Sequence, residues 1–233
     1  MRCKIGLNNE SFRQEWIKNT LKQVPSGLHL LDAGAGELAN KKYCQHLEYI
    51  SQDFCQYDGK GDAQALQTGE WDTSKIDIVS DITSIPVENE SFDVVLCTEV
   101  FEHLPDPVSA LNELVRVLKK DGLLILTAPF CSLTHFAPYH FSSGFNKYFY
   151  QHHLGALNCE IKELTENGNF FEYLAQEIHR IPTIADKYSH SKFSFFDRLA
   201  QKILLKALNR FSKKDFGSKE LLCYGYHVVA IKK

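Results

Sequence analysis

Short apolar runs and longer amphipathic segments follow each other along the first half of the chain. Five mostly apolar runs have the length of strands: residues 28–32, 49–53, 76–80, 92–97 and 123–127. Three segments are predicted as helices: 9–24, 37–47 and 106–120. Strands that alternate with helices predict an α/β fold with a doubly wound, mostly parallel sheet. Residues 54–75 lack a regular pattern, and we expect a loop there with at most one short helix.

The last of the three helical segments carries the clearest signals. Asp106 is a good N-cap residue, and Pro107 suits the first helical position. Apolar side chains then recur at helical spacing: Val108, Leu111, Leu114, Val115 and Leu118. Lys119 and Lys120 favour a helix C-terminus, and Gly122 is expected to stop the helix.

The pattern changes after Pro129, where aromatic residues and histidines crowd into residues 130–150. Three helices are expected beyond that point, at 144–157, 169–181 and 193–211, with a loop at 182–191. Alternating apolar residues at 159–165 and 222–232 predict two more strands, which makes seven in all.

The segment 193–211 is predicted as a basic amphipathic helix. One side carries apolar residues: Phe196, Leu199, Ala200, Ile203, Ala207 and Phe211. Another side carries a positive charge every four residues: Arg198, Lys202, Lys206 and Arg210. We expect the apolar side to pack on the domain and the basic side chains to face water. The alternatives are that residues 193–214 lie on an anionic membrane surface or cover a charged substrate.

Composition bounds the kind of protein without indicating its ligand. The chain has 233 residues, 44% of them hydrophobic, which is enough for a full core, so we expect a single domain over 1–233. The net charge of −3 gives no indication of nucleic-acid binding. No run of 18 apolar residues is present, and no transmembrane segment is expected. The seven cysteines are scattered without a CxxC pair, which favours reduced thiols in a cytoplasmic protein.

A turn with two glycines follows the first predicted strand, in the run Leu30-Leu31-Asp32-Ala33-Gly34-Ala35-Gly36. Glycine allows a positive φ and lets a ligand approach the backbone closely. Gly34, Gly36 and Ala39 fit the relaxed dinucleotide fingerprint, and Asp53 lies where the ribose-binding acid of that fingerprint belongs. By itself, the turn is compatible with any nucleoside ligand or with none.

Acidic residues recur at the ends of the predicted strands: Asp32, Asp53, Asp81 and, just after the fourth strand, Glu99. In an open parallel sheet, the carboxyl ends of the strands form the edge at which ligands bind. Several carboxylates there are unfavourable for a polyphosphate. They favour a ligand with hydroxyls, an amine and a positive charge, because carboxylates accept hydrogen bonds and stabilise cations.

Four segments together resemble a known family: residues 31–36, Asp81-Ile82 with Ile85-Pro86, residues 91–95 and residues 99–104. In this order and spacing they are similar to the class I S-adenosylmethionine-dependent methyltransferases, in the small-molecule branch called methyltransferase type 11. The run Arg-Val-Leu-Lys-Lys-Asp-Gly at 116–122 also matches the family, with Asp121 where glycine or proline is common.

The resemblance covers roughly residues 28–130 and implies a fold and a division of the chain. The fold is a Rossmann-like, seven-stranded, mostly parallel sheet with an antiparallel C-terminal strand and a helical insertion before it. The cofactor-binding core would occupy 28–130, and an acceptor-side cap with the helical insertion would occupy 130–221.

The resemblance also assigns roles around S-adenosylmethionine. The cofactor-binding residues that it implies are Asp32, Ala33, Gly34, Ala35, Gly36, Asp53, Phe54, Asp81, Ile82, Thr98, Glu99 and His103. The glycine turn would receive the methionine end, Asp53 the ribose hydroxyls and Asp81 the adenine amine. Phe54 would pack on the adenine. Thr98 and Glu99 would line the methionine end, and His103 would line the cleft.

Methyl transfer from a sulfonium is an in-line displacement in which the enzyme aligns the acceptor and excludes water. If the acceptor is a hydroxyl, a general base is needed, and the segment after the fifth strand offers His135, Tyr139 and His140. No carboxylate or cysteine accompanies the histidines at 135 and 140, or those at 152 and 153, at ligand spacing, so no metal is expected. We expect a small-molecule acceptor, by analogy a sugar or glycan precursor.

Two other functions are compatible with these motifs. One is a methyltransferase-like domain that binds the cofactor, or a partner, without catalysis. The other is a nicotinamide-dependent dehydrogenase, in which Ala39 would fill the third fingerprint position. The Asp81-Ile82 pair and the segment 99–104 argue against the dehydrogenase. The complete set of cofactor positions argues against a loss of binding but does not prove turnover.

Overall fold

A computed structural model describes residues 4–233, which form two compact units. The sheet unit consists of residues 14–165 and 225–233, and the helical unit consists of the residues up to 13 together with 166–224. Residues 130–165 thus fold with the sheet. The predicted division into a core at 28–130 and a cap with insertion at 130–221 stays a prediction.

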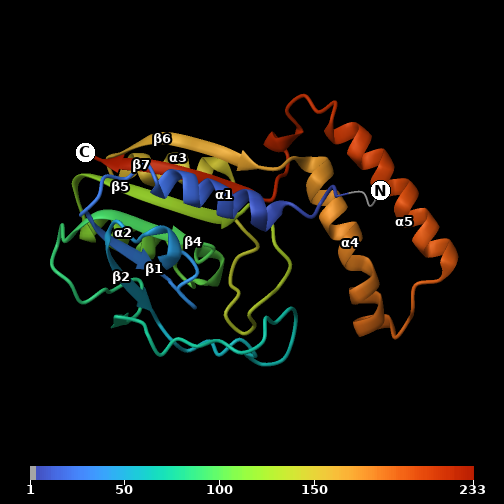
Figure 1. Cartoon of the computed structure of the whole chain (residues 1–233), viewed down its shortest axis with the longest axis horizontal. Helices are drawn as coiled ribbons and strands as arrows, with labels where there is room; N and C mark the ends of the chain where they lie inside the picture. Colours follow the sequence, from blue (N-terminus) through green and yellow to red (C-terminus); the bar gives the residue numbers. More distant parts are fainter. Residues whose placement is uncertain (1–3) are drawn as a thin grey trace. The chain divides into compact units, whose positions relative to one another are not determined.

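Over the described residues, the sheet has seven strands in the order β3-β2-β1-β4-β5-β7-β6 (Figure 1). The strands are β1 (His29–Ala33), β2 (Glu48–Asp53), β3 (Ile78–Val79), β4 (Phe92–Thr98), β5 (Leu118–Pro129), β6 (Cys159–Asn167) and β7 (Gly225–Lys232). β1 pairs in parallel with β2 and β4, β2 with β3, and β4 with β5. β7 is antiparallel to β5, with Val228 opposite Leu126. The predicted α/β fold with an antiparallel C-terminal strand is confirmed.

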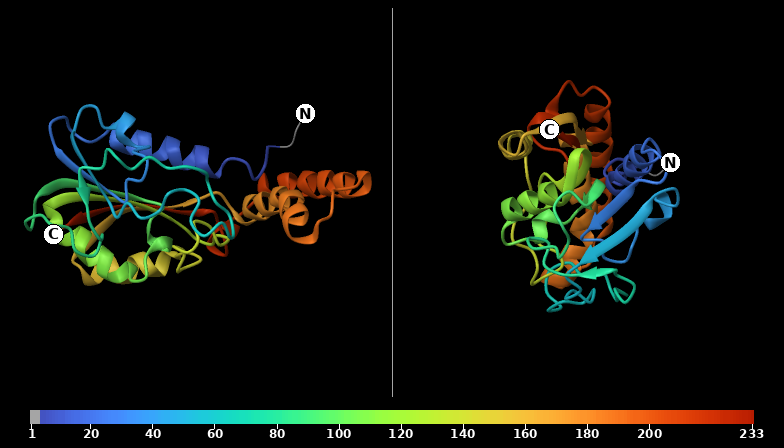
Figure 2. Two further views of the ribbon diagram at one scale, coloured as in Figure 1. Left: turned by 90° about the horizontal axis from the view of Figure 1, so that it is seen from below. Right: turned by 90° about the vertical axis from the view of Figure 1, so that its left-hand side faces the viewer.

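Helices cover both faces of the sheet (Figure 2). On one face lie α1 (Asn9–Leu21) and the 3₁₀ turn η1 (Lys41–Tyr43), and on the other lie α2 (Pro107–Val117) and α3 (Lys147–Ala156). Ile17 and Leu21 of α1 are fully buried and pack with Leu30, Val94 and Ile125 of the central strands. Each such side chain contributes about 1.5–3 kcal/mol through burial of apolar surface, so this layer holds the strands in place.

The predicted helix at 37–47 is wrong. Apart from η1, this connection consists of turns in which an amide donates to the carbonyl three residues earlier, as from Leu47 to Cys44. Leu38 has a φ of 60°, in the left-handed region, which interrupts an α-helix. Asn40 is buried and donates its side-chain amide to Thr98 Oγ1 at 3.0 Å. A tertiary hydrogen bond therefore takes the place of helical ones.

The helix predicted at 106–120 is confirmed in its first part, where the Asp106 carboxylate caps α2 by accepting from the amide of Ser109. α2 ends at Val117, and the residues up to 120 that were assigned to the helix begin β5 instead. Lys119, on this part of β5, forms an ion pair with Asp93 at 2.8 Å. Between β2 and β3 the chain is irregular, without a helix, and β3 is shorter than predicted.

The helical unit contains α4 (Phe170–Ser189), α5 (Phe195–Ser212) and the 3₁₀ turn η3 (Ser218–Glu220). α4 runs through Pro182, so the predicted loop at 182–191 is wrong over most of its length. Proline has no amide to donate to the carbonyl of residue i−4, here Ile178. That carbonyl instead accepts from Gln201 Nε2 of α5 at 2.8 Å. The neighbouring helix supplies the hydrogen bond that proline cannot make.

The predicted packing side of α5 is also wrong. Leu205 and Leu208 are buried against α4, on the same side of the helix as Gln201. The stripe predicted to pack is largely exposed, with Phe196 76% and Ile203 60% exposed. None of the helices in residues 4–233 is long and apolar enough to cross a membrane. Contact of residues 193–214 with a membrane surface stays a prediction.

We predict that Gln201→Leu lowers the free energy of unfolding by about 0.5–1.5 kcal/mol, because the partly buried carbonyl of Ile178 loses its donor. Urea unfolding measures this loss. The control is the same substitution in a Pro182→Ala background, where alanine restores the backbone amide and the substitution should cost much less. Equal losses in both backgrounds would contradict this role for Gln201.

Candidate functional site

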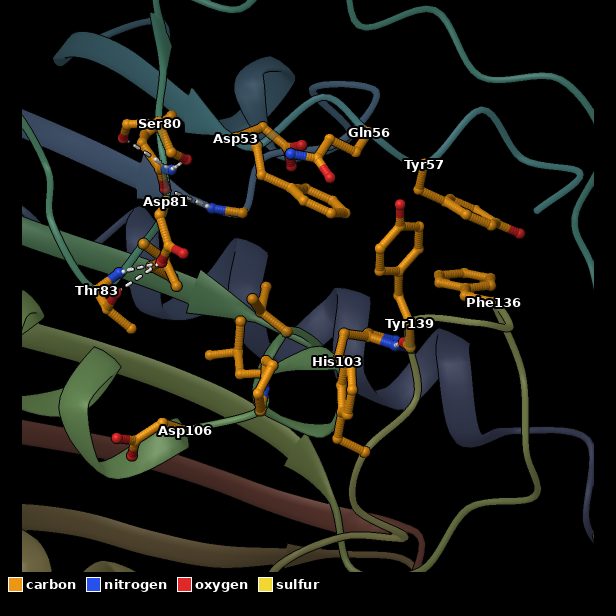
Figure 3. A pocket seen from close by; sticks show the side chains of 18 of the residues that line it. Asp53, Gln56, Tyr57, Ser80, Asp81, Thr83, His103, Asp106, Phe136 and Tyr139 are labelled. Atoms are coloured by element: carbon orange, nitrogen blue, oxygen red, sulfur yellow. Dashed lines mark hydrogen bonds between the residues drawn. The ribbon is translucent and has the colours of Figure 1, made fainter. Parts of the chain in front are cut away.

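A cavity of about 560 Å³ lies in the sheet unit at the carboxyl ends of β1, β2, β3 and β4 (Figure 3). It opens where the strand order reverses between β1 and β4, the position at which open α/β sheets bind ligands. Its wall includes several residues implied as cofactor-binding: Gly34, Asp53, Phe54, Asp81, Ile82, Glu99 and His103. The fold thus brings together motifs that lie far apart along the chain.

Asp53, the last residue of β2, holds the glycine turn in place. Its Oδ2 accepts from the amide of Gly36 at 3.0 Å, and its Oδ1 accepts from the amide of Cys55 at 2.8 Å. The carboxylate is nearly buried yet lines the cavity. Because an ionised carboxylate offers about four acceptor positions, Asp53 can still accept from the hydroxyls of a ligand.

Gly34 allows the turn to pass close to the segment after β4. Its φ is 72°, and a Cβ at this position would come within 2.4 Å of the Val100 side chain. A larger residue would push the turn and this segment apart. The glycine therefore serves the packing of the turn as well as the approach of a ligand.

Asp81 follows β3 on the wall of the cavity (Figure 3). Its Oδ1 accepts from the amide of Thr83 at 2.8 Å and from the Thr83 hydroxyl at 2.7 Å. The loop leading to it is held by Gln52, whose side-chain amide donates to the carbonyl of Ser80 at 2.7 Å. These bonds fix the orientation of the Asp81 carboxylate before any ligand arrives.

Some of the residues implied as cofactor-binding do not line the cavity: Asp32, Ala33, Ala35, Gly36 and Thr98. Asp32 is 1% exposed, and the Tyr49 hydroxyl donates to its Oδ2 at 2.7 Å. Burial raises the pKa of Asp32 to about 7; the hydrogen bond from Tyr49 opposes this rise, and the charge of Asp53 adds to it. Asp32 therefore supports the turn from behind the cavity wall.

Five aromatic residues, called here the aromatic lid, also line the cavity: Phe54, Tyr57, Trp71, Phe136 and Tyr139. Tyr57 stacks on Phe136 with ring centres 4.7 Å apart, and Tyr139 meets Phe54 edge to face at 5.1 Å. The main chain joins the two lid segments where the amide of residue 136 donates to the carbonyl of residue 66 at 3.0 Å. The sequence singled out Phe54 and Tyr139 and placed Phe136 in the aromatic stretch 130–150, but it gave no indication of Tyr57 and Trp71. The density of aromatic residues was the available signal for Phe136, whereas irregular sequence hid the remaining two.

Beside the lid, the structure gathers three histidines that lie on two separate segments. The ring centre of His135 is 4.7 Å from that of His103 and 4.9 Å from that of His140. Of the candidate bases, Tyr139 lines the cavity, while His135 and His140 lie behind its wall, next to His103. Burial, with a contribution from the other two histidines, lowers the pKa of His103 to about 3, so that it is neutral at physiological pH.

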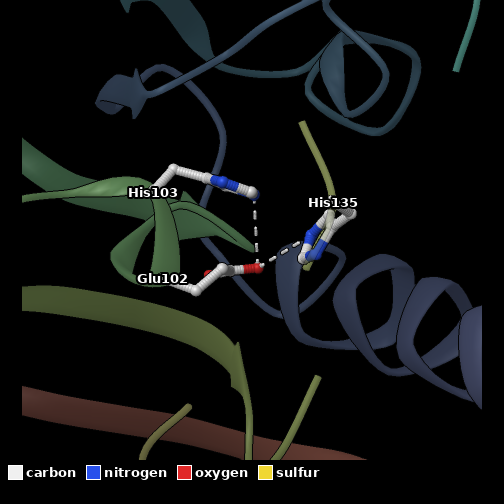
Figure 4. A group of neighbouring side chains, drawn as sticks. All are labelled: Glu102, His103 and His135. Carbon is white, nitrogen blue, oxygen red and sulfur yellow. Dashed lines mark ion pairs between the residues drawn. The ribbon is translucent and has the colours of Figure 1, made fainter. Parts of the chain in front are cut away.

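Glu102 completes this group, although it was not predicted as a site residue. It is 1% exposed, and its Oε1 lies 3.6 Å from His103 Nε2 and 3.9 Å from His135 Nε2 (Figure 4). The available signal was its position beside His103 in the segment 99–104. The spacing of the histidines along the chain gave no indication of Glu102, because Glu102 and His135 are far apart in sequence and become neighbours only in the folded protein.

Residues 31–126 match a family described as a methyltransferase domain, over the same strands and turns that form the cavity. The resemblance of this part of the chain to the class I S-adenosylmethionine-dependent methyltransferases is thereby confirmed. S-adenosylmethionine is the cofactor of this family, in agreement with the acids at the strand ends.

Two curated relatives of this methyltransferase have quinones in their names. It is 28% identical over 204 residues to the demethylmenaquinone methyltransferase of Chlamydia pneumoniae, an alignment that covers 82% of this chain and 81% of the relative. It is 50% identical to a ubiquinone biosynthesis O-methyltransferase of Haemophilus ducreyi, but over 38 residues that cover 16% of each protein.

The solved structures that are similar to this methyltransferase share its fold. The phosphoethanolamine N-methyltransferase 2 of Haemonchus contortus, in complex with S-adenosyl-L-methionine, matches with a TM-score of 0.55 and 17% identity. The match covers 94% of this chain and 52% of that one. At this identity the likeness shows the fold alone.

We predict that Asp32→Asn stabilises this methyltransferase at pH 8 by several degrees in Tm, with a much smaller gain at pH 5. The raised pKa means that the stability contributed by Asp32 is complete below about pH 4 and is lost as pH rises toward about 7. Asparagine keeps an acceptor for Tyr49 and carries no charge. Thermal unfolding at the two pH values measures the difference.

Asp93→Asn is the matched control, because its ion pair with Lys119 and the amide of His29 lower the pKa of Asp93 in spite of partial burial. Its effect should have the opposite sign and be nearly equal at pH 5 and pH 8, because both values lie above the ordinary pKa of an aspartate, and a lowered pKa affects stability only at lower pH. A Tm gain for Asp32→Asn that is independent of pH would show that Asp32 is not a buried titrating carboxyl.

Proposed function

We propose that this protein transfers the methyl group of S-adenosylmethionine to a hydroxyl of a small aromatic acceptor. The observation that carries the proposal is one cavity that is lined both by acids and by the aromatic lid, beside a cluster of histidines. The acids suit the hydroxyls, amine and sulfonium of the cofactor. The lid suits a flat, apolar acceptor.

The aromatic acceptor is favoured over the sugar-type acceptor expected from the sequence. Rings that stack or meet edge to face bind other rings through the same geometry, with about 0.5–1.5 kcal/mol per pair beyond the area buried. The names of the curated relatives support the same class, since they describe enzymes that methylate quinone precursors. None of these names refers to a sugar.

The reaction requires that the acceptor oxygen be aligned with the methyl group and that the hydroxyl lose its proton. The acceptor oxygen forms a bond to the methyl carbon while the carbon–sulfur bond breaks, and the electron pair of that bond stays on sulfur as S-adenosylhomocysteine. The hydroxyl proton must leave, and the candidate bases are Tyr139, which lines the cavity, and His135 and His140, which lie next to His103 of the cavity wall. The aromatic lid excludes water, so that the sulfonium meets the acceptor rather than solvent.

For the cofactor half of the proposal, we predict that Asp81→Asn weakens binding of S-adenosylmethionine at least tenfold. The asparagine oxygen can still accept from Thr83, but its amide then faces the adenine amine, donor against donor. Calorimetry measures the affinity. Asp72→Asn is the control, because Asp72 accepts from the amide of Ser74 in a similar turn and is exposed. Equal affinities in both variants would contradict the role of Asp81.

For the acceptor half, we predict that labelled methyl groups pass from S-adenosylmethionine to catechol-type compounds and not to monosaccharides in the same panel. Combining His135→Ala with His140→Ala should reduce the rate by about 10²-fold or more, the usual contribution of a positioned base, with little change in cofactor affinity. Cofactor binding without transfer to any compound would favour a binding domain without catalysis. Transfer to sugars alone would refute the aromatic acceptor.

A further inference from the structure

Glu102, His103 and His135 turn three electron-pair donors toward one point (Figure 4). One ligand atom from each residue lies within 4.8 Å of the others. The carboxylate comes from η2 (Phe101–His103), together with one of the histidines, and the other histidine comes from the lid segment. Residues so far apart in sequence meet here because the carbonyl of Glu102 accepts the amides of Phe141 and Ser142, at 2.9 and 3.1 Å.

The hydrogen bonds of the two histidines decide which nitrogen faces the carboxylate with a lone pair. Nδ1 of His103 lies 2.5 Å from the carbonyl of Tyr139, and Nδ1 of His135 lies 2.9 Å from the carbonyl of Leu133. A carbonyl can only accept, so each Nδ1 carries the proton and donates it. In the neutral rings, both Nε2 atoms then present lone pairs to Glu102. Histidines that bind metals in proteins are held in the same way, by a backbone carbonyl or a carboxylate on the other nitrogen.

The spacing fits a cation of the size of zinc. Ligand atoms at about 2.0–2.2 Å from the ion, arranged tetrahedrally, lie about 3.3–3.6 Å from one another. The Glu102 oxygen is already 3.6 Å from one Nε2 and 3.9 Å from the other. Small side-chain rotations would complete the geometry. Two imidazoles and one carboxylate suit zinc, cobalt, manganese or iron better than magnesium or calcium, which prefer oxygen ligands.

We propose that Glu102, His103 and His135 form a binding site for one divalent transition-metal cation at the acceptor end of the cavity. The absence of a companion carboxylate led the sequence analysis to expect no metal, and the fold supplies that carboxylate. His103 is part of the cavity wall and connects the site to the bound acceptor. His140, whose Nε2 lies 3.2 Å from Ser132 Oγ, lies next to the group but outside it.

The role of the cation rests on the proposed function, although its binding does not. Three protein ligands leave a coordination position open for an oxygen of the acceptor. A cation held there would lower the pKa of that hydroxyl, whose proton would pass to His140 beside the group while its oxygen forms the bond to the methyl carbon as described above. His135 then serves as a ligand rather than as a base.

The test is calorimetric titration of zinc chloride into the full chain after treatment with a chelator. One equivalent should bind to the unmodified protein. Glu102→Gln keeps the shape of the side chain but removes the charge and should weaken binding at least tenfold, and His135→Ala should do the same. His152→Ala removes an exposed histidine on α3 and should bind zinc like the unmodified protein. Cobalt(II) gives a second measurement, through visible absorption bands that the two site variants should lose.

Two results would overturn the site: no zinc binding by the unmodified protein, as expected if Glu102 only pairs with a protonated histidine, or equal binding by every variant. Binding of S-adenosylmethionine checks that each variant is folded. If His135→Ala does not fold, Glu102→Gln alone tests the metal site. Zinc binding without methyl transfer to any aromatic hydroxyl would refute the proposed function and leave the metal site standing. Methyl transfer by a protein that binds no zinc would refute the metal site and leave the proposed function standing.

Discussion

The carboxylate of Asp53 connects two strand ends, and the geometry of the cavity depends on that connection. It accepts from the amide of Gly36 in the turn after β1 and from the amide of Cys55 just after β2. Gly34 then packs against Val100, in the segment that follows β4. The ends of three strands that are adjacent in the sheet, β2, β1 and β4, are thereby held at one edge of it. The acids in these segments meet because parallel strands all end on the same side.

The lid shows how irregular segments can be as well defined as a sheet. Neither the loop after β2 nor the segment after β5 contains a helix where the two meet, at Leu66 and His135. Stacked rings and a few main-chain hydrogen bonds hold them together instead. The same segment reaches the carbonyl of Glu102 through the amide of Phe141, and this contact is part of what brings His135 to the buried carboxylate. The packing that encloses the cavity therefore also places His135 beside Glu102.

The differences between expectation and structure share a physical cause. Residues 37–47 were predicted as a helix from local pattern, but Asn40 bonds to the end of β4 and the left-handed Leu38 turns the chain. Pro182 was predicted to end a helix, but Gln201 satisfies the carbonyl that proline leaves without a donor. In both places a partner distant in sequence outweighs the local preference, and local patterns contain no information about such partners.

The sequence by itself determined the class of fold and, apart from residues 37–47, most of the succession of strands and helices, and it predicted the acids at the strand ends as a cofactor site. These follow from apolar periodicity and from motifs whose spacing is local, and a parallel sheet needs no further information to bring strand ends together. Only the tertiary structure decided which of those residues face the cavity. Asp32 lies behind the wall and Asp53 in it, although both end strands. The meeting of Glu102 with His135 was likewise decided by the path of the lid, because side chains on separate segments become neighbours only when packing closes the distance between them.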